Sequence, residues 1–273
     1  MAGDGSSTGG VGKGAKRPGK EQPLARRTVA GGPHTSKTPA AGSEGAPQPR
    51  PPTGARSRGA DATRERLIDA ALDAFGLNGF DGASTRDIAR RAGANLAAIP
   101  YHFGGKEGLH RAVAQHIVNG VVGKLGPLID TIEAALRVTP LPRRVAQRLL
   151  HRALDRAADT LLGRPEAARW ARFIIREQMD PTASFAVLYD GFMGRAHRLI
   201  TALYAAAAGR DASDPETAVR VFAILGQLLV FRMARGLVEA RLGWHGYGPE
   251  EVALVKTMLH AHLDALLAAE ARP

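Results

Sequence analysis

From residue 61 onward, apolar residues recur at helical spacing in segments that glycine and proline separate. The first segment, expected as a helix over 63–77 that Asn78-Gly79 ends, has one apolar face made by Leu67, Ile68, Ala71, Leu72 and Phe75. The same periodicity continues toward the C-terminus, and the aromatic content of 5% is low for a large β-sandwich. The pattern therefore predicts an all-α fold.

The first 60 residues differ in composition from the rest of the chain. They hold 13 of the 32 glycines, 8 of the 17 prolines and +7 of the formal charge of +11. Such a segment buries too little apolar surface to offset the entropy of ordering its backbone. We expect 1–60 to form a disordered basic arm, which either adds salt-sensitive attraction to nucleic acid or serves only as a solvated linker.

The sequence argues against several classes of protein. It contains no cysteine, which excludes disulfides, thiolate metal sites and a cysteine nucleophile. It has no nucleophile-elbow, P-loop or H-E-x-x-H motif, and Glu107 and His110 form one E-x-x-H pair where a di-metal helical bundle needs two. We therefore expect no enzyme, no cofactor and no metal site.

Membrane insertion and secretion are not expected either. No stretch approaches the roughly 20 apolar residues needed to span a bilayer, and the N-terminus lacks the apolar core of a signal peptide. The sequence thus predicts a cytoplasmic protein without membrane contact.

Two short helices are expected after the first long one. Ser84 can cap a helix that begins at Thr85 and ends at Gly93, and Asn95 can cap a second helix. The second helix has a narrow apolar stripe made by Leu96, Ile99 and Phe103. Two short helices joined by a glycine-containing turn and packed on a longer helix are the elements of a helix-turn-helix, here over about 84–103.

The second short helix presents small and polar side chains away from its apolar stripe. Tyr101 lies opposite the stripe, with Ala97 and Ala98 beside it and His102 at the border. Small side chains let a backbone approach a DNA groove closely, and alanine can contact a thymine methyl group. Pro100 lies inside the helix and should shorten or distort it. The pattern indicates a surface that reads nucleic acid; the alternative is a small helical hairpin without that role.

Two runs of residues resemble a known family. T-R-D-I-A-R-R-A-G-A-N over 85–95 and Y-H-F-G-G-K-E-G-L over 101–109 look like the DNA-binding domain of TetR/AcrR-type transcriptional regulators. The run over 99–108, taken with R-E-Q-M-D-P over 176–181, is similar to the CecR-like subgroup.

The resemblance implies an all-helical dimer with two domains. It places a three-helix DNA-binding domain over 61–121 and a larger effector-binding and dimerisation domain over 122–273. By the same resemblance, Thr85 and Arg86 begin the positioning helix, residues Asn95 to His102 enter the major groove, and Lys106 meets a phosphate at a helix N-terminus. Many relatives carry polar residues where this chain has Leu96, Ala97 and Ala98, so its specificity would depend on methyl contacts and DNA shape.

The C-terminal part is expected to consist of long helices, because a proline stands where each could begin. The expected helices lie near 128–138, 142–162, 165–179, 182–208, 215–241 and 249–270. The last two are the candidates for a homodimer seam, with apolar faces made by Val221, Leu225, Leu228, Leu229, Arg232, Val238, Val252, Val255, Leu259, Leu263, Leu266 and Leu267. The alternative is that these residues form the core of a monomer.

A candidate effector pocket is suggested by a concentration of large side chains in one short stretch. It comprises Trp170, Phe173, Arg176, Met179, Phe185 and Tyr189. Aromatic and Met side chains with one Arg could line a cavity for an amphipathic ligand, although residues at such spacing are often core.

The sequence predicts a ligand-responsive regulator, most often a repressor in this family, that binds operator DNA. The alternative function is a non-specific architectural DNA-binding protein driven by the basic arm.

Overall fold

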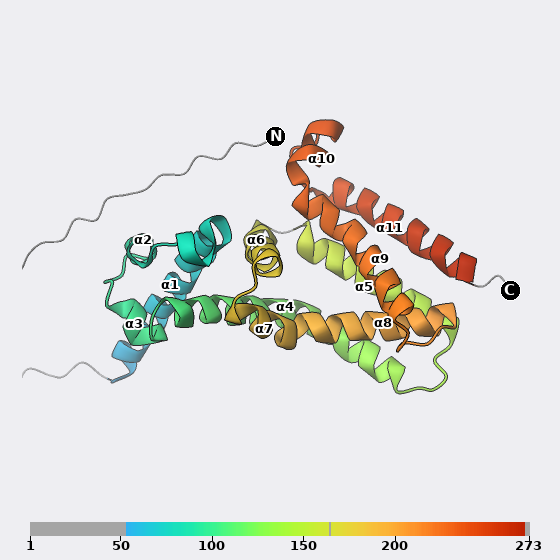
Figure 1. The fold of residues 1–273 in the computed structure, drawn as a ribbon, viewed down its shortest axis with the longest axis horizontal. Coiled ribbons are helices and arrows are strands. Elements are labelled where there is room, and N and C mark those ends of the chain that lie inside the picture. The colour runs from blue at the N-terminus through green and yellow to red at the C-terminus, as the bar shows by residue number, and fades with distance from the viewer. Residues whose placement is uncertain (1–52, 164, 271–273) are drawn as a thin grey trace, which may run out of the picture. The chain divides into compact units, whose positions relative to one another are not determined.

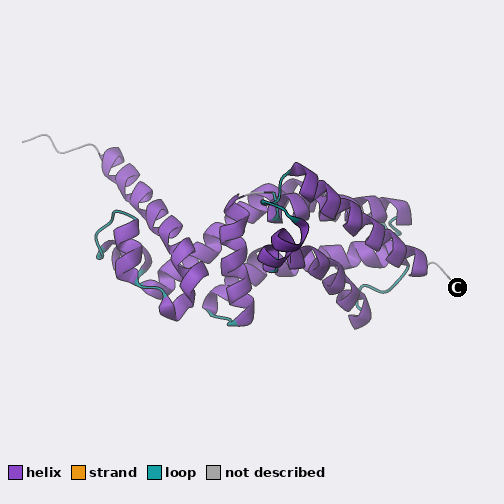
Figure 2. Cartoon of the chain, turned by 90° about the horizontal axis from the view of Figure 1, so that it is seen from above, coloured by secondary structure: helices purple, strands orange, loops and turns teal. Residues whose placement is uncertain are grey.

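The structure is a computed structural model that describes residues 53–163 and 165–270, and within these residues every regular element is a helix (Figure 2). Residues 1–52, most of the expected arm, lie outside the described part. The elements are α1 Thr53–Gly82, α2 Thr85–Arg91, α3 Ala98–Phe103, α4 Lys106–Leu136, α5 Arg143–Leu161, α6 Pro165–Met179, α7 Ala183–Leu188, the π-helical turn η1 Tyr189–Met193, α8 Gly194–Ala208, α9 Pro215–Met233, α10 Arg235–Leu242 and α11 Pro249–Glu270 (Figure 1). The predicted all-α class is confirmed.

Helix α1 begins ten residues earlier than predicted. Its first residue is Thr53, so residues 53–60, which were expected to belong to the arm, are helical. The helix is interrupted at Gly79, which has a φ of 74° that a residue with a Cβ rarely adopts. The predicted end at Asn78-Gly79 is therefore the place where the regular helix breaks.

Proline marks the start of some helices but not of all. Helices α6 and α11 begin at Pro165 and Pro249, as predicted. Pro127 does not begin a helix, because α4 runs through it from Lys106 to Leu136. Ile129 and Ile132 are buried beyond the proline, and we attribute the continuity of α4 to that packing, which compensates for the missing amide donor.

Two other predicted helices are each divided. The segment expected over 182–208 consists of α7, η1 and α8, and the segment expected over 215–241 bends by 73° between α9 and α10. Gly191 lies in η1 against α4, where a Cβ would come within 2.7 Å of both methyl groups of Val118. Thus η1 packs as closely on α4 as a glycine permits.

Two hydrophobic clusters organise the described helices. The head cluster joins α1, α2, α3 and the first half of α4 and also takes in Trp170 and Phe173 of α6 and Leu188 of α7. The bundle cluster joins α5, α8, α9 and α11 with the second half of α4. Figure 1 shows α6 and α7 between these two groups of helices. Helices α6 and α7, although they follow α5 in the chain, therefore complete the core that contains α2 and α3.

Helix α11 corrects the expectation that no segment of the chain is long and apolar enough to span a membrane. By length and composition alone this helix could cross a membrane, and the bent α9–α10 pair could do so together. In the structure α11 packs on α5 and α9, with Val252, Val255, Leu259, Leu263 and Leu267 in the bundle cluster. Lys256 also forms an ion pair with Asp159 of α5, and the pairs His260–Asp155 and Asp264–His151 join the two helices at 2.9 and 2.8 Å.

Candidate nucleic-acid interface

The helix-turn-helix forms through local side-chain caps. The hydroxyl of Ser84 accepts a hydrogen bond from the Asp87 amide at 3.4 Å, so it caps α2 as predicted. Asn95 caps the turn that precedes α3: its Oδ1 accepts from the Ala97 amide at 2.9 Å. These contacts fix the backbone that carries α2 into α3.

Helix α3 begins later than the sequence suggested, and this explains how it accommodates Pro100. Its first helical residue is Ala98, so Pro100 lies in the first turn, where amide groups have no partner inside the helix. The same shift leaves Leu96 in the preceding turn and largely exposed, whereas Ile99 is 1% exposed and Phe103 is half-buried. Leu96 is therefore not part of the buried stripe.

The turn before α3 and the outward face of α3 carry most of the expected side chains, whereas Ala98 packs partly against the head cluster. Tyr101 is 81% exposed, Asn95 and Ala97 are exposed, and Ala98 and His102 are half-buried. The His102 ring lies edge-on to the Tyr101 ring, with the centroids 4.9 Å apart. One aromatic hydroxyl thus projects from a surface of small residues. At the start of α2, Thr85 is half-buried and Arg86 is exposed.

Lys106 is held at the N-terminus of α4. Its ammonium donates to the carbonyl oxygen of Asp81 at 3.1 Å and lies 4.8 Å from the centroid of the Phe80 ring. Gly105, the residue before α4, provides no side-chain cap. The first amides of α4 and the remaining ammonium protons can therefore meet an anion.

Gly108 brings α3 and α4 into close contact. A Cβ at this position would lie 1.7 Å from the carbonyl oxygen of Phe103 at the end of α3. Only glycine fits there without moving one of the two helices.

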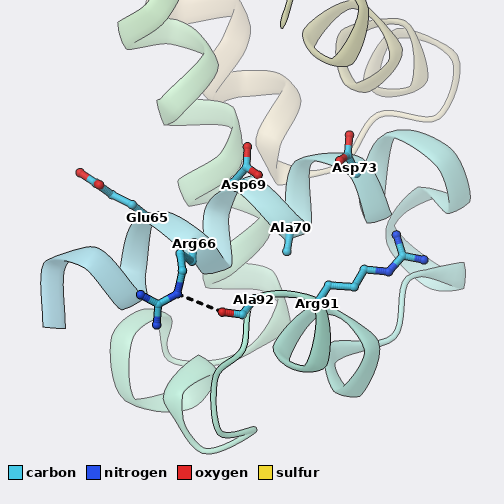
Figure 3. Close-up of a pocket in the computed structure, with 7 residues that line it drawn as sticks. All are labelled: Glu65, Arg66, Asp69, Ala70, Asp73, Arg91 and Ala92. Atoms are coloured by element: carbon cyan, nitrogen blue, oxygen red, sulfur yellow. Dashed lines mark hydrogen bonds between the residues drawn. The ribbon is translucent and has the colours of Figure 1, made fainter. Parts of the chain in front are cut away.

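A surface hollow of about 530 Å³ lies between α1 and α2 (Figure 3). Most of the residues that line it are charged, and Arg66 spans it by donating from Nε to the carbonyl oxygen of Ala92 at 3.0 Å. A second hollow, of about 340 Å³, lies between α1 and α4. The six residues proposed for an effector pocket line neither hollow.

The structure distributes those six residues over different surroundings. Trp170 and Phe173 are buried in the head cluster. Phe185 and Tyr189 stack with their ring centroids 6.0 Å apart, whereas Met179 is 79% exposed. Arg176 donates to the carbonyl oxygen of Leu77 in α1. These six residues thus do not line either of the two hollows described above, and the effector site remains a prediction.

A buried polar network behind the head was not predicted. His110 of α4 lies with its Nδ1 2.7 Å from the hydroxyl of Ser184 and its Nε2 3.6 Å from a carboxylate oxygen of Glu177. The hydroxyl of Thr182 donates to the other oxygen of Glu177 at 2.9 Å. Burial, helped by the charge of Lys106, lowers the pKa of His110 to about 4, so the imidazole is neutral at pH 7. The sequence singled out His110 only as a doubtful metal ligand, and the described residues contain no group of three or more His, Asp or Glu that could hold a metal ion.

The bundle has an apolar outer surface on α9, whose residues differ from those predicted for a dimer seam. Val221, Leu228, Val252, Val255, Leu259, Leu263 and Leu267 pack in the bundle cluster. The exposed apolar residues of α9 are Val219, Phe222, Val230 and Met233, and they are joined by Leu237 on α10 and Leu254 on α11. The helices chosen from the sequence thus carry an outer apolar surface, but the side chains on it are mostly other ones.

Comparison with known proteins identifies both parts of the chain. Residues 67–113 match the family model of bacterial regulatory proteins of the tetR family, and residues 146–270 match the C-terminal domain of the HTH-type transcriptional dual regulator CecR. The CecR protein of Shigella flexneri is 34% identical over 207 residues, covering 76% of this chain and 92% of that protein.

Two further similarities cover less of the sequence or carry less identity. The HTH-type transcriptional repressor NicS of Pseudomonas putida is 40% identical over 88 residues, covering 31% of this chain and 42% of that protein. The crystal structure of a TetR-like regulator from Rhodococcus sp. RHA1 has the same fold, with a TM-score of 0.51 at 18% identity over 76% of this chain and 96% of that one. On the extent of the CecR similarity and the helix-turn-helix described above, the chain belongs to the TetR family of bacterial regulatory proteins and is a DNA-binding transcriptional regulator.

Proposed function

We propose that the chain acts as a homodimeric, ligand-responsive repressor in the cytoplasm, binds a near-palindromic operator through α3, and is released by a small-molecule effector. The observation that carries this proposal is the outward face of α3. It combines the highly exposed Tyr101 with small neighbours, next to the uncapped N-terminus of α4. A helix with such a face can enter the major groove while the N-terminus of α4 receives a phosphate.

The proposed contacts divide into positioning and reading contacts. Thr85, Arg86 and Lys106 would bind the phosphate backbone, which fixes the register of the head on the duplex. The reading residues would be Asn95, Ala97, Ala98, Tyr101 and His102. Because few of these can hydrogen-bond to bases, methyl contacts and DNA shape would contribute much of the specificity.

Dimerisation is supported by the outer surface of α9. Val219 is 64% exposed and Phe222 is 63% exposed, and Leu237 of α10 and Leu254 of α11 are exposed as well. A second copy related by a two-fold axis would cover this surface with the same surface of its own, which gives two heads for two half-sites. A membrane, a cofactor and a metal have no part in this proposal.

An effector would act by moving α4, which begins at Lys106 beside α3, so that the two recognition helices no longer fit successive major grooves. One of the effector residues proposed from the sequence borders this helix, since Trp170 packs on Gly120 of α4. The alternative function, an architectural protein whose basic arm dominates binding, predicts that removal of residues 1–60 abolishes DNA affinity. The regulator predicts that most specific affinity survives this deletion.

The test is a binding titration with variants of the reading face. The probe is the tightest duplex that the intact protein selects from a random library of 40-base-pair DNA. We expect Tyr101→Ala and Lys106→Ala each to weaken binding about tenfold, with unchanged helical circular dichroism. Val138→Ala, which shortens an exposed side chain in the loop after α4, is the control and should bind like the parent. Parent-like binding by both head variants would refute the assignment of the head.

A further inference from the structure

Helix α6 holds α1 through one arginine. Arg169 donates from Nε to Asp73 Oδ1 and from Nη1 to Asp69 Oδ1, each at 2.7 Å. Its Nη2 also donates to the Asp69 carbonyl oxygen at 2.7 Å and to Asp73 Oδ2 at 3.0 Å. Although burial disfavours the charged form, the hydrogen bonds to the two carboxylates outweigh that effect and raise the pKa of Arg169. These four hydrogen bonds fix the guanidinium of Arg169 against α1 in one geometry.

The contact between these two helices extends beyond the arginine. A Cβ on Gly76 of α1 would lie 3.4 Å from Cβ of Arg172, so the helices are in van der Waals contact there. One turn further, Arg176 donates to the carbonyl oxygen of Leu77 at 3.0 Å, just before α1 breaks at Gly79. Helix α6 thus contacts α1 from Asp69 to Gly79.

Helix α1 passes this constraint on to the recognition helix. Figure 3 shows Asp69 and Asp73 projecting from α1 away from Ala92, while Arg66 reaches the Ala92 carbonyl oxygen on the other side. Ala92 lies at the end of α2, directly before the turn into α3. Arg169 and Arg66 therefore hold the same stretch of α1 from two sides: Arg169 binds Asp69 and Asp73, and Arg66 binds the Ala92 carbonyl oxygen at the start of that turn.

We propose that Arg169 is a positioning residue for DNA recognition: by clamping Asp69 and Asp73 it sets the orientation of the head, and thereby the half-site spacing that the dimer accepts. This inference rests on the proposed dimeric function. It adds a route from the C-terminal helices to α3 that does not pass through α4. Without the clamp, α1 keeps its apolar contacts with α6 but can adopt a wider range of orientations, so duplexes of different spacing should bind more equally.

The test measures affinity against spacing with the intact chain. The probes are the duplex selected as above and derivatives with one to five base pairs inserted between its halves. The parent should lose affinity steeply as the spacing changes. We expect Arg169→Ala to reduce the ratio between the best and the worst spacing about tenfold, within the range of coupling between sites. Its thermal unfolding should stay close to the parent's, because a partly exposed ion pair contributes little to stability.

Two further variants separate positioning from a general loss of structure. The charge swap D73R/R169D re-forms an opposite-charge pair and should regain part of the spacing preference. Arg172→Ala, which removes an exposed arginine of α6 that makes no ion pair among the described residues, should leave it unchanged. The proposal would be overturned if Arg169→Ala had the spacing profile of the parent or weakened binding equally on every duplex. It would also be overturned if the charge swap were as indifferent to spacing as Arg169→Ala. Failure of the proposed function would appear differently, as the absence of any selected duplex for the parent.

Discussion

The head and the bundle are made of similar amphipathic helices, yet they expose different surfaces. The head turns small and polar residues outward on α3, with Tyr101 as its one large exposed side chain on that helix. The bundle turns Val219, Phe222 and Met233 outward on α9. Polar and small groups suit a hydrated phosphate groove, whereas exposed apolar area is stabilised by a second apolar surface. The inner faces of the helices thus build the fold, whereas their outer faces suit different partners.

The two regions also differ in how they complete their cores. The bundle cluster is made almost entirely by the long helices of the C-terminal half. The head cluster includes Trp170, Phe173 and Leu188 of α6 and α7, which lie far from the head in the sequence. The head is therefore stabilised by contacts that also connect it to the rest of the molecule, which is the arrangement that a signal from the C-terminal helices requires.

The largest expected effect concerns the outer surface of the bundle. Phe222→Asp places one charge in the proposed seam on each copy, so a two-fold dimer suffers the change twice. We expect the dimer to weaken by about 5 kcal/mol and to dissociate at micromolar concentration in sedimentation equilibrium. Val138→Asp, which alters an exposed apolar residue outside the seam, should leave the dimer intact. A Phe222→Asp protein that stays dimeric would mean that the seam lies elsewhere.

The second prediction tests the packing of the head. Gly108→Ala forces a methyl group onto the carbonyl oxygen of Phe103, so α3 must move relative to α4. We expect a loss of about 3 kcal/mol in the free energy of unfolding, measured with denaturant, and loss of DNA binding. Gly123→Ala on the same helix meets nothing within 4 Å and should be neutral or stabilising by up to about 1 kcal/mol. Equal stability of the two variants would contradict the close contact between α3 and α4.

The third prediction uses the buried network that joins the head to α6 and α7. The pKa of His110 falls from 6.5 to about 4 on folding, so between these values the unfolded chain binds more protons than the folded one. Stability should therefore be complete above pH 6.5 and should decrease by about 3 kcal/mol as the pH falls to 4. His110→Gln, which cannot titrate, should lose about 3 kcal/mol less over this range in denaturant titrations.

The control for the pH experiment is His245→Gln, because His245 is exposed in the turn before α11. That variant should follow the pH dependence of the parent. If His110→Gln and the parent lost stability in parallel, His110 would not be the group that links protons to folding.

Local patterns in the sequence predicted much of the fold. Capping by Ser84, the break at Asn78-Gly79 and the proline-led starts of α6 and α11 all depend on neighbouring residues, and these predictions are confirmed. The prediction that a helix begins after Pro127 was wrong, because tertiary packing allows α4 to continue through this proline. The predicted start of α3 was wrong, because Asn95 caps the turn before the helix and not the helix itself.

Contacts between distant residues set the limit on what could be predicted for the sites. Helix α9 has apolar residues on more than one side, so its sequence does not tell whether Val221 or Phe222 faces inward. The pairing of Arg169 with Asp69 joins positions 100 residues apart, and the network of His110 with Ser184 joins positions 74 apart. The assignment of individual DNA-contacting and effector-binding residues remains a prediction.

The proposal that α3 reads a specific duplex is open to a direct test. It is tested most directly by fluorescence anisotropy of residues 53–273 against the duplex that the intact protein selects and a shuffled duplex of the same composition, at two salt concentrations. We expect tight binding to the selected duplex alone that persists at the higher salt, because base contacts add to the attraction of the phosphates. Equal affinity for both duplexes, abolished at the higher salt, would contradict it.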